Sequence, residues 1–513
     1  MQAIVGTARD RGLGVLAGTL GALLALALCT ACERGRSLVD DTTDPTGPRG
    51  TLGYEPPPPA GGATAPTEPD TVYATPAINQ PGFTIPANFL GLSFEAWDAT
   101  DQPRLKDPVL PKFLKNLGPG ILRYGGSTAD QQCWNPTTRT RCPAGGPTLI
   151  NADFTNIAAF SRAAGWPVIY TVNLVGLMPD TAAAEVQALV AAGGNSLLAV
   201  SIGNEPDQYV TQGLRSSGWG YADFQNEWES YADAINARAS SVKFVGFDGC
   251  CALGTTWMNA FVGAEDPRLV IAGEHIYPTF NGAAPGTTYY PSIANLLSQF
   301  AENRVISDVQ QMYHADGGRL PLRITESNSV GGSGLSGVSN VYASSLWAVA
   351  HMFTLAENGA VGINFHGTFS GGNYEAVSGG SGSYVAHPLY YAMLLFHDAA
   401  RGQTIPVSVT THRNVMVHSA LGSDGTLRVV AINNEANTNV QVRITPGRTF
   451  RSAGTLRLTG PSLDATSGVT YAGAAVGSDG TWTPGTYSPV YTTGGVYAVS
   501  VPAASIAVVT LVP

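Results

Sequence analysis

Strand-like apolar runs alternate eight times with helical patterns between Asn88 and Gly402, and this alternation restricts the fold more than any other feature. Such alternation indicates parallel strands joined by crossover helices. Eight strands of this kind close into a barrel, so we predict an α/β protein built on a (β/α)8 TIM barrel. The expected strands span residues 89–94, 120–124, 167–172, 197–202, 242–247, 269–275, 320–325 and 361–366.

The sequence changes character after Gly402. Short strand-like runs follow one another between turns, and several alternate apolar with polar residues, which is typical of an antiparallel β-sandwich. We therefore expect a barrel at 88–402 and a sandwich at 403–513, with residues 71–87 as candidates to join the sandwich. The expected sandwich strands span residues 407–409, 414–418, 427–432, 440–444 and 506–512.

The first 32 residues resemble an export signal. Arg9 and Arg11 precede an apolar stretch, residues 13–28, that is short and rich in Ala and Gly. Cys32 follows Thr30-Ala31, the position at which a bacterial lipoprotein is cleaved and acylated. We expect lipidation at Cys32, with plain secretion as the alternative.

Residues 33–70 are dense in Pro, Gly and Thr, a composition that cannot bury a core and predicts a disordered tether. The expected location is a cell-surface or outer-membrane lipoprotein, or a periplasmic or secreted protein. A membrane would be a partner only through the N-terminal lipid. The formal net charge of -10 and the absence of a Lys/Arg cluster exclude nucleic acid as a partner.

Four cysteines lie beyond the signal. Cys133 and Cys142 flank a loop, and their spacing suits a loop-closing disulfide in an oxidising compartment. Cys250 and Cys251 are adjacent, which leaves open both two buried thiols and a strained vicinal disulfide. Neither pair has the spacing of zinc ligands, and the eight His form no metal motif, so we predict no metal and no cofactor.

Two of the expected strands end on a glutamate. Glu205 follows the fourth strand, where Pro206 has no N–H to continue the ladder and the chain must leave the sheet. Glu326 ends the seventh strand, before a loop rich in Gly and Ser. In a TIM barrel these strand ends form the active site. A pair of carboxylates there indicates cleavage of a glycosidic bond through an oxocarbenium-like transition state.

The spacing of the two carboxyl groups would decide the stereochemistry. At about 5–5.5 Å the reaction retains configuration, with Glu326 as nucleophile and Glu205 as acid and then base. Asn204 would then hydrogen-bond the sugar 2-hydroxyl. The alternative for each glutamate is a structural carboxylate in a salt bridge or a loop.

The motifs around these strand ends resemble glycoside hydrolase family 79, the β-glucuronidases and heparanase, within a larger clan of retaining (β/α)8 glycosidases. They span nearly the whole barrel, although a bare Asn-Glu-Pro is shared by many members of the clan. The motifs are Gly91-Leu92-Ser93-Phe94-Glu95, Leu122-Arg123-Tyr124-Gly125-Gly126-Ser127, Ile202-Gly203-Asn204-Glu205-Pro206-Asp207, Glu274-His275-Ile276-Tyr277-Pro278, Thr325-Glu326-Ser327-Asn328-Ser329 and Gly362-Ile363-Asn364-Phe365-His366-Gly367.

This resemblance implies a bacterial exo-acting β-glucuronidase that removes terminal β-linked glucuronic acid from glycans, with Glu205 as acid/base and Glu326 as nucleophile. Glu95, at the end of the first strand, is a candidate sugar ligand whose alternative is a structural pairing with Arg123. The other residues that the resemblance places around the terminal sugar are Asp130, Tyr277, His366 and Tyr374.

Each of these four has an ordinary structural alternative. Tyr277 precedes Pro278 and would simply pack, and His366 would be a satisfied core histidine. Asp130 would cap a loop, and Tyr374 would be a turn aromatic.

A glucuronide carries a carboxylate, which usually calls for Arg, Lys or converging hydroxyls and backbone N–H groups. Residues 329–339 and 367–383, the loops after the last two strands, contain no Lys or Arg. The alternative is therefore a retaining β-glycosidase of neutral sugars, of β-glucosidase or β-xylosidase type. A third hypothesis is a non-catalytic surface protein that binds carbohydrate, which the two intact glutamates disfavour. A glycan or glycoconjugate is the partner in every case.

Overall fold

The computed structural model describes residues 70–176 and 178–513, apart from the side chains of 251–255, 266, 300 and 316. The expected export signal with Cys32 and nearly all of the expected tether lie outside these residues. No helix in the described part of the chain is both long enough and apolar enough to cross a membrane.

Eight parallel strands close into a barrel, which confirms the predicted fold. Around the barrel the strand order is β10-β12-β14-β3-β4-β7-β8-β9, so each strand lies beside its neighbour along the chain. Nearly all of their residues are buried, because side chains fill the interior and helices cover the outside. The strands are β3 (Gly91–Glu95), β4 (Ile121–Gly125), β7 (Val168–Val172), β8 (Leu197–Ile202), β9 (Phe244–Cys250), β10 (Leu269–Ile276), β12 (Leu322–Ser327) and β14 (Ala360–His366).

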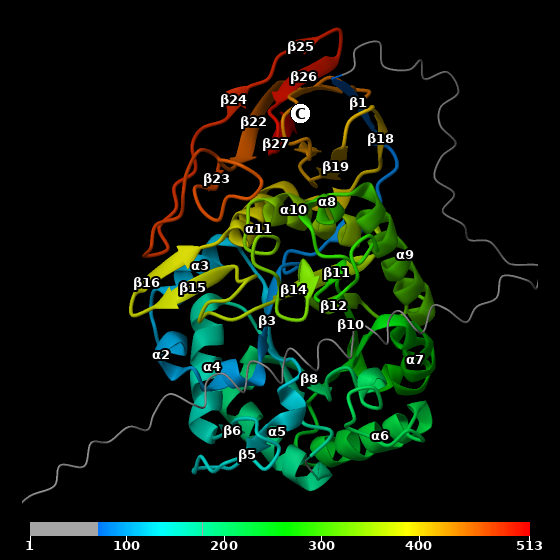
Figure 1. Cartoon of the computed structure of the whole chain (residues 1–513), viewed down its shortest axis with the longest axis vertical. Coiled ribbons are helices and arrows are strands. Elements are labelled where there is room, and N and C mark those ends of the chain that lie inside the picture. Colours follow the sequence, from blue (N-terminus) through cyan, green and yellow to red (C-terminus); the bar gives the residue numbers. More distant parts are fainter. Residues whose placement is uncertain (1–69, 177) are drawn as a thin grey trace, which may run out of the picture.

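Helices surround these strands (Figure 1). The main ones are α3 (Leu110–Asn116), α4 (Asn151–Ala164), α5 (Pro179–Gly193), α6 (Tyr221–Arg238), α7 (Cys251–Glu265), α9 (Gln299–Asp316), α10 (Ala343–Glu357) and α11 (Pro388–Ala399). The short ones are η1 (Ala96–Thr100), α2 (Gln102–Leu105), η2 (Ala129–Gln131), η3 (Gly194–Ser196), η4 (Pro206–Gln208), η5 (Asp266–Arg268) and α8 (Ile293–Leu296).

Three small two-stranded sheets shape the loops that follow the barrel strands. They pair β5 (Cys133–Trp134) with β6 (Thr148–Leu149), β11 (Thr279–Phe280) with β13 (Val330–Gly331), and β15 (Val377–Gly380) with β16 (Ser383–Ala386). The loop after β4 is closed by a disulfide between Cys133 and Cys142, the pair that the sequence predicts. Of the adjacent cysteines, Cys250 is the last residue of β9 and is buried, and Cys251 is the first residue of α7.

The C-terminal region forms two packed sheets. One has the order β18-β1-β21-β26-β25, and the other β2-β17-β19-β20-β27-β22-β23, with β24 beside β22. The N-terminal strand β1 lies in the first sheet and pairs with β18 and β21. The strands are β1 (Thr71–Pro76), β2 (Thr84–Ile85), β17 (Gly402–Thr404), β18 (Val407–Thr410), β19 (Val415–Leu421), β20 (Leu427–Asn433), β21 (Val440–Ile444), β22 (Ser452–Thr459), β23 (Thr470–Tyr471), β24 (Ser488–Pro489), β25 (Thr492–Thr493), β26 (Val496–Val501) and β27 (Ser505–Val512).

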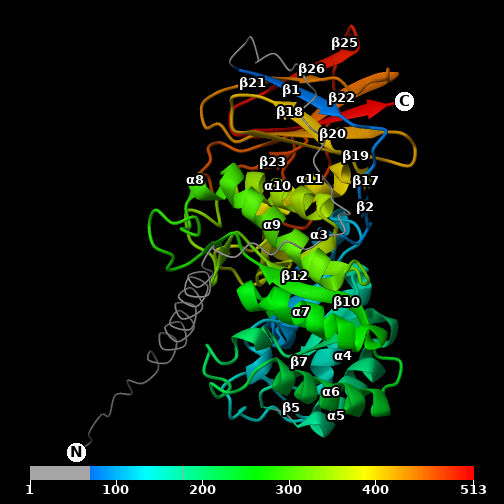
Figure 2. The same ribbon diagram turned by 90° about the vertical axis from the view of Figure 1, so that its right-hand side faces the viewer.

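The larger sheet lies between two apolar cores. On β20, Val429 and Ala431 face the core between the two sheets, whereas Val430 and Ile432 belong to the core shared with the barrel. Because successive residues of a strand point to opposite faces, such a strand must be apolar throughout. The sandwich lies at one end of the molecule, with α10 and α11 between it and the barrel strands (Figure 1, Figure 2).

One ion pair also joins the two domains. Nδ1 of His418 on β19 lies 3.0 Å from an oxygen of Glu357, the last residue of α10. The ring of His418 stacks on Phe353, with 5.2 Å between the ring centroids. Burial alone would lower the pKa of His418, but the negative charges of Glu357 and then Glu302 raise it above its ordinary value.

The raised pKa of His418 predicts that this contact stabilises the protein most at mildly acidic pH. A histidine whose pKa is higher in the folded state contributes fully below its unfolded value, about 6.5, and loses that contribution as the pH rises through the folded value. We expect Glu357→Gln to lower the free energy of unfolding by about 1 kcal/mol near pH 6 and by less in alkaline solution. Urea denaturation across this range measures the difference. A difference that is constant with pH would contradict the assignment, and His412→Asn, at an exposed position, is the control.

Candidate active site

The carboxylate of Glu326 lies at the end of β12 and is held on both oxygens. The hydroxyl of Tyr277 donates to Oε1 at 2.8 Å, and Nη1 of Arg123 donates to Oε2 at 2.9 Å. His366 Nδ1 lies 3.6 Å from the same Oε2. Burial would raise the pKa of Glu326, but the charges of His366, His275 and Arg123 outweigh it and hold the pKa well below its usual range. This carboxylate is therefore ionised at neutral pH.

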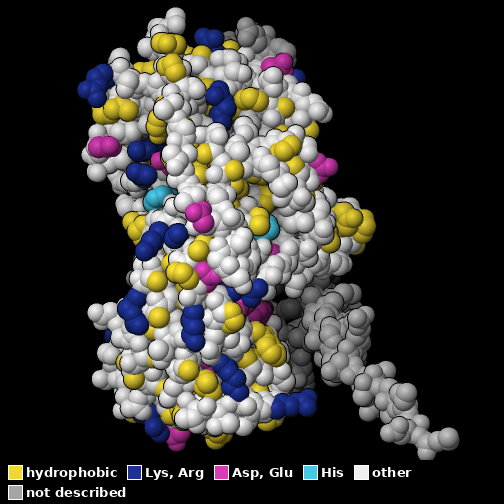
Figure 3. All heavy atoms as spheres, turned by 90° about the vertical axis from the view of Figure 1, so that its left-hand side faces the viewer, with side chains coloured by type: hydrophobic (Ala, Val, Ile, Leu, Met, Phe, Trp, Pro, Cys, Tyr) yellow, Lys and Arg dark blue, Asp and Glu magenta, His cyan; other side chains and the backbone are white. Residues whose placement is uncertain are grey.

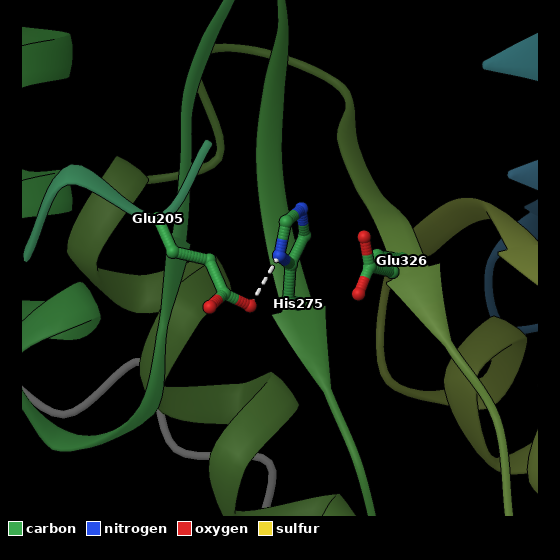
Figure 4. A group of neighbouring side chains, drawn as sticks. All are labelled: Glu205, His275 and Glu326. Atoms are coloured by element: carbon green, nitrogen blue, oxygen red, sulfur yellow. Dashed lines mark hydrogen bonds and ion pairs between the residues drawn. The ribbon is translucent and has the colours of Figure 1, made fainter. Parts of the chain in front are cut away.

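Glu205 has different surroundings. It follows β8 and directly precedes Pro206, the first residue of η4, and its backbone lies in the left-handed region at φ 50°. Its side chain is 11% exposed, and Oε1 shares a hydrogen bond of 2.8 Å with Nδ1 of His275 on β10. Figure 4 shows the imidazole of His275 between the two carboxylates.

The two carboxylates are close. One oxygen of Glu205, one ring nitrogen of His275 and one oxygen of Glu326 all lie within 4.8 Å of one another. Three such donors are also a possible set of metal ligands. The Glu326 oxygens, however, already accept bonds from Tyr277 and from Arg123, whose charge repels a cation. The arrangement therefore suits proton transfer and attack at carbon better than metal binding.

Arg123 on β4 joins most of the site together. Its guanidinium is fully buried and donates to Glu326, to Oδ1 of Asn204 at 2.8 Å, and to Oγ of Ser93 at 2.9 Å. Its Nη2 and Nε also donate to one oxygen of Asp248, at 3.1 and 3.2 Å. A buried cation needs such partners, because an unpaired charge in the interior is very costly.

Asp248 on β9 connects this network to Glu205. Its carboxylate accepts from Arg123 and, on the other oxygen, from the hydroxyl of Thr325 at 2.6 Å. Its carbonyl accepts the backbone N–H of Glu205 at 2.9 Å. Burial would raise the pKa of Asp248, but Arg123 and His275 lower it. Asp248 thus bonds the backbone of Glu205 directly and is linked to the side chain of Glu326 through Arg123.

His366, at the end of β14, lies between two carboxylates. Its Nε2 is 3.4 Å from Oε1 of Glu95, and its Nδ1 faces Glu326. Burial would lower its pKa, but Glu326 and Glu95 raise it to about 9, so the ring is a cation at neutral pH. Glu95 also accepts bonds from the backbone and the hydroxyl of Thr128. Glu95 is therefore a partner of His366 and Thr128 rather than of Arg123.

The two predicted tyrosines lie beside Glu326. Tyr277 donates to it directly, and the ring of Tyr374 is buried at 6.2 Å from that of His366. Gly334 has φ +70°, and a Cβ there would lie 2.6 Å from the ring of Tyr374. Only a glycine lets the loop after β12 approach this closely.

Asp130 lies among hydrogen-bond donors from the segments that follow β7 and β8. Its carboxylate is 3% exposed and accepts bonds from the backbone N–H groups of Leu174 and Asn204 and from the hydroxyl of Tyr209. These donors reach both oxygens and give Asp130 a positioning role, and its part as a sugar ligand stays a prediction. It fixes the backbone of Asn204, whose side chain is bonded to Arg123.

The sequence did not lead us to assign a function to three residues at the centre of the site, namely Arg123, His275 and Asp248. Arg123 and His275 lay within the quoted motifs, where their position one or two residues from a strand end was the available signal. Asp248 had no such signal, because no motif surrounds it and only the barrel brings it to Arg123.

Comparison with known proteins supports a glycosidase relationship. Residues 417–508 match the model of the glycosyl hydrolase family 79 C-terminal beta domain. A β-glucuronidase of Aspergillus niger is 25% identical over 358 residues, which cover 61% of this chain and 63% of that protein. A baicalin-β-D-glucuronidase of Scutellaria baicalensis is 22% identical over 194 residues, which cover 37% of this chain and 36% of that protein. The chain thus matches less than two thirds of the length of either relative.

Solved structures share the fold over most of the chain. A 4-O-α-L-rhamnosyl-β-D-glucuronidase from Fusarium oxysporum has a TM-score of 0.71 and 19% identity, and covers 86% of this chain and 100% of its own. A family 51 arabinofuranosidase from Xanthomonas axonopodis pv. citri has a TM-score of 0.63 and 16% identity, and covers 86% and 99%. The C-terminal domain is thus of the glycosyl hydrolase family 79 type, and the comparisons support the resemblance of the whole chain to that family.

Proposed function

We propose that the protein is a retaining exo-β-glucuronidase that removes terminal β-linked glucuronic acid from glycans. The observation that carries this proposal is the pair Glu205, after β8, and Glu326, at the end of β12, which have oxygens within 4.8 Å of each other. That separation suits a double displacement, because an inverting enzyme needs room for a water between the carboxyl groups.

The surroundings of the two glutamates assign their roles. Glu326 is held ionised and oriented by Tyr277 and Arg123, as a nucleophile must be. In the first step Glu326 attacks the anomeric carbon while the Glu205 carboxyl protonates the departing oxygen, which forms a glycosyl ester. In the second step Glu205 takes a proton from water, and that water displaces Glu326 from the sugar.

The relatives named as β-glucuronidases support the choice of a glucuronide. The loops after β12 and β14 supply no Lys or Arg, so a uronate would bind through the Tyr374 hydroxyl and the glycine-rich backbone at 331–334. The absence of Lys and Arg from these two loops favours the alternative, a retaining β-glycosidase of neutral sugars. The two hypotheses share Glu205 and Glu326 and differ only in the sugar.

Hydrolysis of nitrophenyl β-D-glucuronide beside the matching β-D-glucoside tests the proposal. We expect the glucuronide to be preferred, and Glu326→Ala to lose at least about a thousandfold in kcat. Azide should restore activity to Glu205→Ala, because azide is an anion and attacks the glycosyl ester without a base to remove a proton. Glu326→Ala, which cannot form this ester, should not yield the same glycosyl azide. The anomer formed first, observed by NMR, reports retention.

Preference for the glucoside would overturn the choice of sugar and leave the roles of the glutamates intact. Turnover that is unchanged in both glutamate variants would overturn the mechanism as well.

The contacts of Asp248 predict a positioning role in this reaction. Asp248→Asn keeps the size of the side chain but removes the charge that orients Arg123, and we expect kcat to fall about 100-fold with little change in KM. Thr325→Val removes only the hydroxyl that bonds the other oxygen of Asp248, so its loss should be smaller. Steady-state kinetics measure both, and urea unfolding identifies a variant that fails to fold. A well-folded Asp248→Asn with kcat within about twofold of the wild type would refute the role.

A further inference from the structure

The segment after β8 stays attached to β9 although the ladder between the two strands has ended. The last ladder partners of these strands are Ser201 and Val245. Further along, Pro206 has no N–H to donate, so a regular ladder cannot continue there. The end of β9 is buried, and buried backbone groups without partners are costly. The backbone of β9 near Cys250 therefore needs other partners on this side.

Two side chains of η4 bond the backbone of Cys250 in place of a strand. Oδ1 of Asp207 accepts a hydrogen bond from the N–H of Cys250 at 3.0 Å, and Nε2 of Gln208 donates to the carbonyl of Cys250 at 3.3 Å. The same Nε2 donates to Oδ2 of Asp207 at 2.8 Å, which joins the two side chains to each other. We call these three hydrogen bonds the η4 clasp.

Both side chains of the η4 clasp are buried. Charged side chains normally lie at the surface, and Figure 3 shows Lys, Arg, Asp and Glu side chains spread over one face of the molecule. Asp207, by contrast, is 5% exposed and Gln208 is 4% exposed. A carboxylate at such a depth is tolerated because both of its oxygens accept hydrogen bonds.

The η4 clasp holds Glu205 from two directions. Along the chain, the N–H of Gln208 donates to the carbonyl of Glu205 at 2.9 Å. Across the sheet, Cys250 is the ladder partner of His275 on β10. His275 shares a hydrogen bond with the carboxyl of Glu205, which points toward it in Figure 4. The backbone and the side chain of Glu205 are thus both fixed relative to one residue, Cys250.

This fixation matters because the backbone of Glu205 is left-handed. A residue with a side chain keeps such a conformation only where several contacts impose it. The N–H of Glu205 donates to the carbonyl of Asp248 at 2.9 Å, which is one such contact, and the η4 clasp supplies the others. Without the clasp the turn can relax, and the carboxyl of Glu205 moves with it.

We propose that Asp207 and Gln208 are positioning residues that hold Glu205 where it protonates the departing oxygen. The inference rests on the proposed glycosidase function and adds the support of one of its two glutamates. The hydrogen bonds of the η4 clasp reach the turn of Glu205, and none of them reaches Glu326. Loss of the clasp should therefore weaken proton transfer more than attack at carbon.

Two leaving groups separate proton transfer from attack. The alkoxide of methyl β-D-glucuronide needs a proton as it departs, whereas the phenolate of dinitrophenyl β-D-glucuronide leaves without one. We expect Asp207→Ala to lower kcat/KM about 100-fold for the methyl substrate and by less than about threefold for the dinitrophenyl substrate. Gln208→Leu, which keeps the charge of Asp207, should show the same split with a loss of about tenfold. Asp207→Asn keeps an oxygen for the N–H of Cys250 and should recover part of the loss.

Asp479→Ala is the matched control, because Asp479 accepts the N–H of Thr481 in an exposed turn of the sandwich. It should leave both substrates unchanged, and urea unfolding identifies any variant that fails to fold. Equal losses on the two substrates in a folded variant would contradict the positioning role. A loss in Asp207→Ala without one in Gln208→Leu would show an effect of charge alone and would also contradict it.

Hydrogen exchange tests the η4 clasp without turnover. The N–H of Cys250 should exchange at least about tenfold faster in Asp207→Ala than in the wild type, because its acceptor is gone. Unchanged exchange would refute the clasp. If the wild type prefers the glucoside, the same two leaving groups on glucose provide the test. A wild type that cleaves neither sugar would overturn the proposed function together with this inference, whereas normal turnover without the split would overturn the inference alone.

Discussion

The buried guanidinium of Arg123 is the group on which the geometry of the site depends. It donates to side chains from β3, β9 and β12 and from the segment after β8, so one cation fixes the relative positions of four parts of the barrel. An unpaired charge at this depth would cost several kcal/mol, on the order of 3–5, and this penalty restricts the register of the strands around it. The contact that orients Glu326 is thus also a condition of correct barrel closure.

The attachment of the sandwich follows from a second constraint, the burial of one sheet on both faces. Residues of β20 and β27 supply alternate side chains to the inter-sheet core and to the core shared with the barrel. An apolar surface this continuous leaves little freedom between the domains. The sandwich therefore serves the barrel as a support for α10 and α11, and α10 begins shortly after the loop that follows Glu326.

Much of this architecture could be predicted from hydrophobic runs. All eight barrel strands lie within a few residues of their expected positions, because buried parallel strands are apolar throughout and their ends carry Gly, Pro or a charged residue. The contacts of Arg123 could not be predicted, since they join residues up to 203 positions apart and depend on closure. The contacts of Asp130 could not be predicted for the same reason: the donors that bond its carboxylate come from the segments that follow the next two barrel strands.

Two neighbouring residues of the site have left-handed backbones, Glu205 at φ 50° and Asp248 at φ 53°, and the N–H of the first bonds the carbonyl of the second. Such a conformation costs a side-chain-bearing residue about 1–3 kcal/mol, a cost that glycine avoids. Selection for thermal resistance alone would thus favour glycine at the two places where a carboxylate is needed. The site therefore keeps two residues in a backbone conformation that lowers the stability of the fold. An engineered, more heat-stable form would have to gain its stability elsewhere in the molecule.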